Sequence, residues 1–231
     1  MRPDHIRLIT RVRSALRHDH WAVVAHPTTP EQAAQVKAVL HGSAAAVPLA
    51  GCASHALLAA ESQGQTRLVW LDLHAAGVSR ATGRSQQHQD IADLHCNAVA
   101  LPQDAVLAPG ALAWLQPRAI AALASLQVGV TGAQLRRTVQ YVSERKQFDR
   151  VIGSFQLVAG QMADGHIALE ALRSALWQLV YRIDAGQATT PQAHGVRALA
   201  NDTGHRVGHM AQHVHGGMGV DVTYPIHRFL Y

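Results

Sequence analysis

The stretch Tyr141-Val-Ser-Glu-Arg-Lys-Gln-Phe-Asp-Arg-Val-Ile-Gly-Ser-Phe-Gln156 lies between two long segments in which apolar residues recur three and four positions apart. That spacing predicts amphipathic helices over about Leu112–Phe148 and Ser154–Ala185. We expect Ser154 to cap the second helix, because its hydroxyl can accept an otherwise unpaired backbone N–H. Gly186 is expected to end that helix. The stretch is therefore predicted to contain the connection between two helices.

Two further segments complete a helical C-terminal half. A third helix is expected over about Gln192–His215, ending at the Gly216–Gly217 pair. A short last segment, Tyr224–Tyr231, is expected to begin around Pro225. Three long helices with short connections predict an antiparallel bundle over residues 109–231.

Residues 1–108 follow a different pattern, in which short apolar runs are separated by turn residues. Each run predicts a strand, and the five runs are Trp21–His26, Val36–Gly42, Ala56–Ala60, Thr66–Leu73 and Ala98–Leu101. Residues 27–40 could instead form a short helix, with Thr29 as its cap and Pro30 at its first position. The predicted fold class is therefore α+β, with a small β-rich domain at residues 1–108 followed by the helical bundle.

The composition is that of a globular protein, with 48% hydrophobic and 15% charged residues. The sequence predicts no membrane span and no secretory signal. Cys52 and Cys96 lack the spacing of a metal site, which favours free thiols in a reducing cytoplasm. The net charge is +5, but the densest basic run, Arg136–Arg150, has no RNA-binding pattern. A phosphate-bearing cofactor is therefore a better expectation than nucleic acid.

Three motifs resemble the acyl-CoA dehydrogenase family. Residues 141–156 resemble Y-x-x-x-R-x-Q-F-G-x-x-I-x-x-F-Q, and residues 214–228 resemble H-G-G-x-G followed by Y-P-x-x-R. Residues 96–107 resemble the strand that leaves the family's central β-domain, often V-x-V-P-x-x-x-x-L. The resemblance implies an FAD-dependent enzyme that introduces an α,β double bond into an acyl-CoA thioester. Electron-transferring flavoprotein is the acceptor that the family usually employs.

The resemblance also implies a set of residues that contact the FAD of a neighbouring subunit: Arg145, Gln147, Phe148, Ile152, Phe155, His213, Gly216 and Gly217. Their chemistry is suitable, because arginine can grip a pyrophosphate and glycine lets a ligand approach the backbone closely. His213 stands where glutamine is common, and a histidine's charge depends on pH. Taken singly, these residues could instead be a surface ion pair of Arg145 with Glu144 or Asp149, ordinary core phenylalanines and a helix C-cap.

The chain departs from the family pattern at both ends. Few residues precede the first strand candidate, so the N-terminal all-α domain is expected to be absent, and the chain ends at Tyr231, before the usual catalytic glutamate. The alternative position for the base falls near Ala119, which is not a base. Glu144 and Glu170 are expected to be surface residues, so no catalytic residue is assigned.

His213 in the glutamine position, together with the Y-P-I-H-R ending at residues 224–228, resembles a subgroup of actinobacterial hetero-oligomeric α2β2 dehydrogenases that act on steroid-side-chain thioesters. In that subgroup the partner of the glutamate-bearing subunit is shorter or lacks the base, which agrees with the departures at both ends. The implied partner is a longer homologue that carries the glutamate, while this chain completes the flavin site and holds the assembly together. One alternative is a non-catalytic scaffold that binds no flavin. Another is a complete homo-oligomeric enzyme with an unrecognised base.

Other sites find less support in the sequence. His205, His209 and His213 share one helix face and could bind zinc or nickel. The flanking Arg206 and Gly208 offer neither a nearby glutamate nor a group that would orient the histidines. They are expected to be solvated or to line a subunit or cofactor surface, and no metal is assigned. The sequence contains no G-x-S-x-G elbow, Rossmann fingerprint or P-loop.

Overall fold

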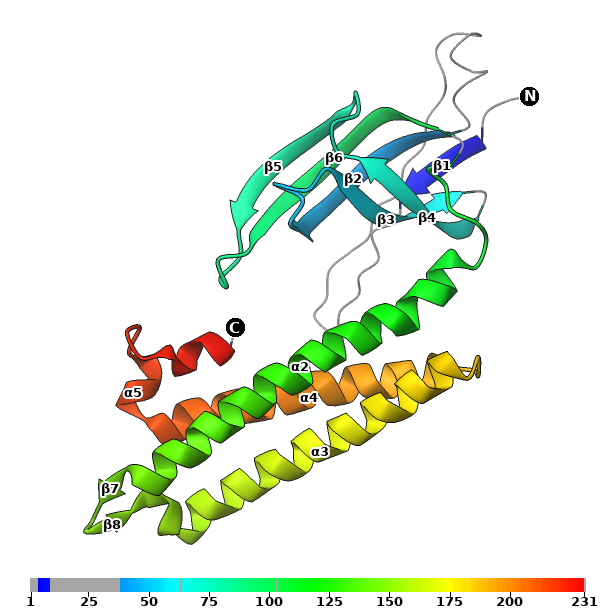
Figure 1. The fold of residues 1–231 in the computed structure, drawn as a ribbon. Coiled ribbons are helices and arrows are strands. Elements are labelled where there is room, and N and C mark those ends of the chain that lie inside the picture. Colours follow the sequence, from blue (N-terminus) through cyan, green and yellow to red (C-terminus); the bar gives the residue numbers. More distant parts are fainter. Residues whose placement is uncertain (1–3, 9–37, 63, 103, 231) are drawn as a thin grey trace. The chain divides into compact units, whose positions relative to one another are not determined.

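The computed structural model describes residues 4–8, 38–62, 64–102 and 104–230. The chain divides into two compact units, Met1–Trp114 and Leu115–Tyr231. The first unit contains the sheet, and the second contains most of the helical residues (Figure 1).

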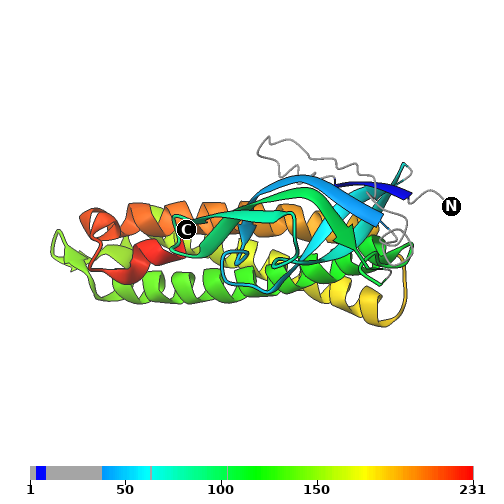
Figure 2. The same cartoon turned by 90° about the horizontal axis from the view of Figure 1, so that it is seen from above.

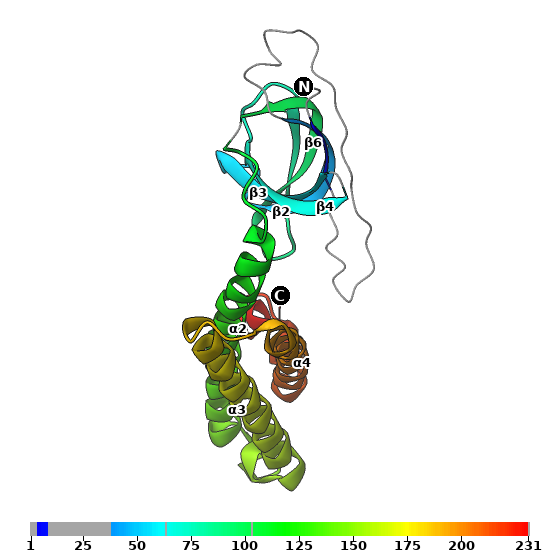
Figure 3. The same ribbon diagram turned by 90° about the vertical axis from the view of Figure 1, so that its right-hand side faces the viewer.

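The first unit is a six-stranded sheet with the strand order β4-β3-β1-β2-β6-β5. The strands are β1 (Asp4–Leu8), β2 (Ala38–Pro48), β3 (His55–Ser62), β4 (Gln65–Asp72), β5 (Val78–Arg84) and β6 (Asp90–Leu101). All neighbouring pairs are antiparallel except β1 with β2, which run parallel. The sheet curves strongly, as the view along the strands in Figure 3 shows.

One face of this sheet forms the core of the unit. Alternate residues of β6 are buried from Ala92 to Cys96, as a strand with one covered face requires. The alternation shifts by one residue at Asn97–Ala98, where Ala98 has a φ of 53°, and it resumes at Val99. This irregularity keeps the apolar side chains on the same face on both sides of it.

The strand predictions are confirmed where the structure describes them. Ala56–Ala60 lies within β3, Thr66–Leu73 nearly coincides with β4, and Ala98–Leu101 is the end of β6. Val36–Gly42 overlaps the start of β2, whereas Trp21–His26 lies outside the described residues. The alternative helix over 27–40 also lies mostly outside them, and its last three residues belong to β2.

The second unit is built on three long helices, α2 (Ala111–Glu144), α3 (Gln156–Asp184) and α4 (Thr190–His215). One apolar cluster joins Ala124, Leu172 and Val196, and another joins Leu135, Leu169 and Val207. From the first cluster to the second, residue numbers rise in α2, fall in α3 and rise in α4. The helices are therefore alternately antiparallel, and they lie side by side in Figures 1 and 2. The predicted α+β class and the antiparallel bundle are confirmed.

The helix ends differ from prediction at one important place. Helix α2 ends at Glu144, before the predicted Phe148, and a hairpin follows, made of β7 (Lys146–Gln147) and β8 (Arg150–Val151). A short 3-10 turn, η1 (Ile152–Ser154), then leads into α3. The prediction that Ser154 caps α3 is wrong, because its hydroxyl donates to the Val151 carbonyl at 2.7 Å and Phe155 occupies the cap position.

The other predicted ends agree with the structure. Gly186 has a φ of 62° just after α3, and Gly216 has a φ of 57° at the end of α4. Such left-handed positions favour glycine. Helix α5 (Gly217–Val220) and the 3-10 turn η2 (Pro225–Phe229) complete the unit. Within the described ranges, none of the helices is both long and apolar enough to cross a bilayer.

Candidate functional site

The first candidate segment is the hairpin that connects α2 to α3. Phe148 and Asp149 are its two loop residues, and both have positive φ, 54° and 62°. A two-residue loop of the type I′ class needs this conformation at both positions. The backbone N–H of Ile152 donates to the Arg145 carbonyl at 2.8 Å and closes the base of the hairpin. A phenylalanine in the left-handed region is uncommon, and such residues cluster at functional sites.

Aromatic rings and a cation gather on this hairpin. The Phe148 side chain is 86% exposed, and its ring meets that of Phe155 edge-on, with centroids 6.2 Å apart. The Arg150 guanidinium lies over the Phe155 ring, 4.0 Å from its centroid. Phe155 is therefore held between a positive charge and a second ring, an arrangement that cation–π and edge-to-face attraction both favour. Arg150 was not among the residues predicted to contact the cofactor.

Arg145 lies at the base of the hairpin and is exposed. Among the residues described, no carboxylate lies within 4.0 Å of its guanidinium, so the surface pair with Glu144 or Asp149 that was the alternative interpretation is not formed. Glu144 instead accepts a hydrogen bond from Gln140 at 3.0 Å. The Arg145 charge is thus presented to solvent in a form suited to an anionic ligand.

The second candidate segment is the turn after α4. Gly216 has a ψ of −130° and donates to the carbonyls of Gln212 and His213, at 3.2 and 3.1 Å. The helix C-cap expected here is therefore present. A Cβ atom built on Gly216 or Gly217 would meet no described atom within 4 Å, so the backbone of both is open to a ligand. His213 is exposed on the last turn of α4.

A ring stack centred on a buried histidine connects the two segments. His215 is only 3% exposed, and its ring stacks on Tyr141 with centroids 4.2 Å apart and planes inclined by 22°. The ring of Tyr224 also contacts the His215 ring, with centroids 5.5 Å apart. Burial lowers the pKa of His215, opposed by a hydrogen bond between Nδ1 and the Ala211 carbonyl at 2.8 Å. The sequence contained a signal for this stack, since Tyr141 and His215 belong to the two recognised motifs.

The two glutamates of the bundle are both accessible to solvent. Glu144 is exposed, as predicted, and Glu170 is half-exposed and forms an ion pair with Arg173. His205 and His209 have ring centroids 4.3 Å apart. Across the described ranges, no three His, Cys, Asp or Glu side chains come together in a way that could hold a metal ion.

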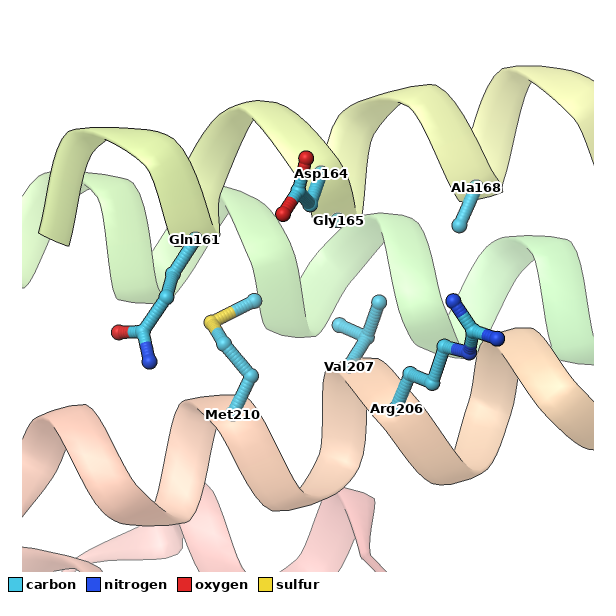
Figure 4. Close-up of a pocket in the computed structure, with 7 residues that line it drawn as sticks. All are labelled: Gln161, Asp164, Gly165, Ala168, Arg206, Val207 and Met210. Atoms are coloured by element: carbon cyan, nitrogen blue, oxygen red, sulfur yellow. The ribbon is translucent and has the colours of Figure 1, made fainter. Parts of the chain in front are cut away.

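A shallow cavity of about 220 Å³ lies between α3 and α4 (Figure 4). Its lining has an apolar middle, formed by Val207 and Met210, and polar groups from Gln161, Asp164 and Arg206. None of the predicted cofactor residues lines it. Its volume is smaller than the roughly 300 Å³ at which small-molecule sites begin, so the cavity is a minor feature beside the hairpin.

Residues 118–231 match the acyl-CoA dehydrogenase C-terminal domain. The chain is 38% identical to acyl-CoA dehydrogenase FadE27 of Mycobacterium tuberculosis over 124 residues, which are 50% of this chain and 33% of that protein.

Two solved structures are similar to the chain. A variant of the Tcur3481–Tcur3483 steroid ACAD has a TM-score of 0.79 at 38% identity and covers 83% of this chain and 52% of that one. The ChsE4–ChsE5 complex from Mycobacterium tuberculosis has a TM-score of 0.79 at 30% identity, with 83% and 53% covered. The chain thus spans about half the length of these structures and about a third of its curated relative.

Proposed function

Residues 118–231 make this chain a member of the acyl-CoA dehydrogenase family, and we propose that it is one subunit of an FAD-dependent enzyme that introduces an α,β double bond into an acyl-CoA thioester. The observation that carries the proposal is the hairpin after α2. It combines an exposed Arg145 that no carboxylate of the described chain pairs with, and an exposed Phe148 in a left-handed conformation.

The residues present fit an FAD edge. Arg145 would bind the pyrophosphate, because its planar guanidinium can donate two parallel hydrogen bonds to phosphate oxygens. Phe148 and Phe155 would pack on the ring system and exclude water from it. The open backbone at Gly216 and Gly217 would let the cofactor approach closely. The bound flavin supplies the hydride acceptor for the β-carbon of the thioester.

We further propose that a partner subunit, a longer homologue, supplies the catalytic glutamate in an α2β2 assembly. The similar structures bear the names of two-component proteins, Tcur3481–Tcur3483 and ChsE4–ChsE5. Glu170 is held in an ion pair with Arg173, and Glu144 binds Gln140, so both carboxylates of the bundle that were considered as bases have other partners. The steroid ACAD among the similar structures supports a steroid-side-chain thioester as substrate.

The expected compartment is the cytoplasm. Cys52 and Cys96 are both free, one exposed and the other buried, which agrees with a chain that folds without disulfides. We also propose that the two parts of the chain have separate roles. Residues 1–108 form the β-rich domain, and residues 109–231 form the domain that contacts the flavin and holds the assembly together.

The test is to purify the chain alone and together with the product of its adjacent gene as the candidate partner. We expect FAD, measured by its visible absorbance, and acyl-CoA oxidation, measured with an artificial electron acceptor, only in the complex. Stoichiometric FAD and acyl-CoA oxidation by the lone chain would refute the division of roles.

Arg145→Ala distinguishes a cofactor role from a scaffold role. In the complex, we expect about tenfold weaker FAD retention or more, because a charged hydrogen-bonding partner of the phosphates is lost. Arg197→Ala is the matched control, since Arg197 is an exposed arginine on α4 outside the hairpin. Unchanged FAD content combined with weaker assembly would instead favour the non-catalytic scaffold.

A further inference from the structure

His215 is a buried titratable residue to which the proposed chemistry assigns no role. Its Nδ1 atom lies 2.8 Å from the Ala211 carbonyl oxygen, and only a protonated nitrogen can donate to a carbonyl. Its Nε2 atom is buried and has no hydrogen-bond partner among the described residues. The ring is therefore neutral, with its single proton on Nδ1, and a second proton would have no acceptor.

The surroundings of His215 are aromatic. Tyr141 from α2 stacks on the ring and Tyr224, which precedes η2, meets it at an inclination of 44°. These two phenols are the titratable groups whose rings face the imidazole. In the part of the chain that the structure describes, no carboxylate forms an ion pair with His215. Burial, which disfavours the charged imidazole, is therefore the main cause of the lowered pKa of His215.

Two members of this stack, Tyr141 and His215, lie next to the candidate cofactor segments in the chain. The Tyr141 carbonyl accepts the backbone N–H of Arg145 at 2.9 Å, at the point where α2 gives way to the hairpin. His215 is the last residue of α4, and the open Gly216–Gly217 turn follows it. A displacement of the imidazole would therefore change the position of the glycine turn relative to the hairpin.

We propose that the Tyr141–His215–Tyr224 stack positions the hairpin and the Gly216–Gly217 turn as one cofactor-binding edge, with His215 as its positioning residue. This inference rests on the proposed FAD function. A stacked, hydrogen-bonded support of this kind fixes a binding edge before the ligand arrives, which lowers the cost of binding. Protonation of His215 would place a charge at the unpartnered Nε2 and loosen the stack.

The experiment compares two variants in the purified complex. His215→Ala removes the ring, and we expect FAD affinity to fall by about tenfold or more, because small displacements of a binding edge have large effects. His215→Phe keeps a ring that can stack but cannot titrate, and we expect it to restore most of the affinity. His194→Ala, an exposed histidine in the first turns of α4, is the control.

The pH profile supplies a readout that a purely structural role would not change. Because the fold disfavours the charged imidazole, its contribution to stability is complete above about pH 6.5 and is lost as the pH falls below that value. We therefore expect wild type and His194→Ala to release FAD increasingly as the pH falls below about 6.5, and His215→Phe to release it much less.

The outcomes separate this inference from the proposed function. A folded His215→Ala complex, verified by circular dichroism, that binds FAD as wild type does would overturn the positioning role and leave the function intact. The same conclusion would follow if His215→Phe released FAD with the wild-type pH profile. A wild-type complex without FAD would overturn the proposed function itself. The stack would then be tested by thermal unfolding, where His215→Phe should flatten the decrease in stability toward low pH.

Discussion

The interior and the rim of the helical unit use the same kinds of side chain in opposite ways. In the interior, Tyr141 and Tyr224 enclose a neutral His215, and the apolar residues around Leu172 exclude water. On the rim, the rings of Phe148 and Phe155 and the charge of Arg150 gather at an exposed hairpin. The buried His215 ring and the 86%-exposed Phe148 ring are the two extremes, since the first lies within the bundle and the second remains available to a ligand.

This difference has an energetic consequence. A ring removed from water stabilises the fold through the apolar area that it buries. An exposed ring provides that favourable free energy only when another surface covers it. An exposed phenylalanine in a left-handed conformation is costly for the isolated chain. The rim is thus suited to binding, and substitutions there should change ligand retention more than folding.

The largest effect on stability is expected for Leu172→Ala in the interior. Leu172 has 0% exposure and packs with residues of all three long helices. Truncation of a buried leucine costs about 2–5 kcal/mol, because transfer energy is lost and a cavity remains. The free energy of unfolding, measured by urea denaturation of the complex, should fall by that amount. Leu157→Ala is the control, because Leu157 is 76% exposed on α3. Equal losses for both variants would contradict the distinction between interior and rim.

The interior is also the part of the molecule that the sequence predicted best. Helices α2, α3 and α4 follow from apolar residues spaced three and four apart, since that spacing requires a common buried face. The C-terminal limits of α3 and α4 follow from Gly186 and Gly216, whose positive φ excludes most other residues. In the sheet, β3, β4 and the end of β6 were predicted because their apolar runs are short and bounded by turns.

The elements that were missed lack such a signal. Strand β5, with the sequence VSRATGR, is an edge strand with mostly exposed side chains, and neither its composition nor its alternation indicates burial. The first strand of the hairpin was predicted as helix because Lys146–Phe148 continues the composition of α2. Its turn uses Phe148 and Asp149 instead of the asparagine and glycine typical of that turn. Local sequence preference could not identify it.

The residues of the candidate site were predicted, but the ring contact that connects its two segments was not. Resemblance supplied Arg145, Phe148 and the glycine pair, and the structure places the first two on one hairpin. The link through Tyr141 and His215 depends on a contact between residues more than seventy positions apart, which periodicity does not contain. The contact of each predicted residue with FAD stays a prediction.

A smaller effect, of the opposite sign, is expected for Asp149→Gly on the rim. Asp149 has a φ of 62°, where a side chain adds strain and glycine adds none. Glycine is also the residue at this position in the family pattern. The substitution should stabilise the chain by up to about 1 kcal/mol, offset in part by the greater freedom of the unfolded chain. Thermal unfolding measures the change, and a clear destabilisation would show that the Asp149 carboxylate has a role in the fold.

The smallest effect on stability is expected for Arg150→Gln, which removes the cation from the Phe155 ring. An exposed cation–π contact contributes about 0.5–1 kcal/mol, so unfolding of the complex should change little. FAD retention should change more, because the Phe155 ring loses the group that holds it beside Phe148. Arg150→Lys should restore charge but not the planar contact, and therefore only part of the affinity.

Arg137→Gln is the matched control for that substitution. Arg137 forms another cation–π contact in the helical unit, 5.5 Å from the centroid of Phe229, and lies outside the hairpin. It should alter stability by a similar or smaller amount and leave FAD retention unchanged. If Arg150→Gln lowered the stability of the complex but left FAD retention unchanged, the rings of the rim would stabilise the fold as those of the interior do. That result would contradict the proposal that the hairpin binds the cofactor.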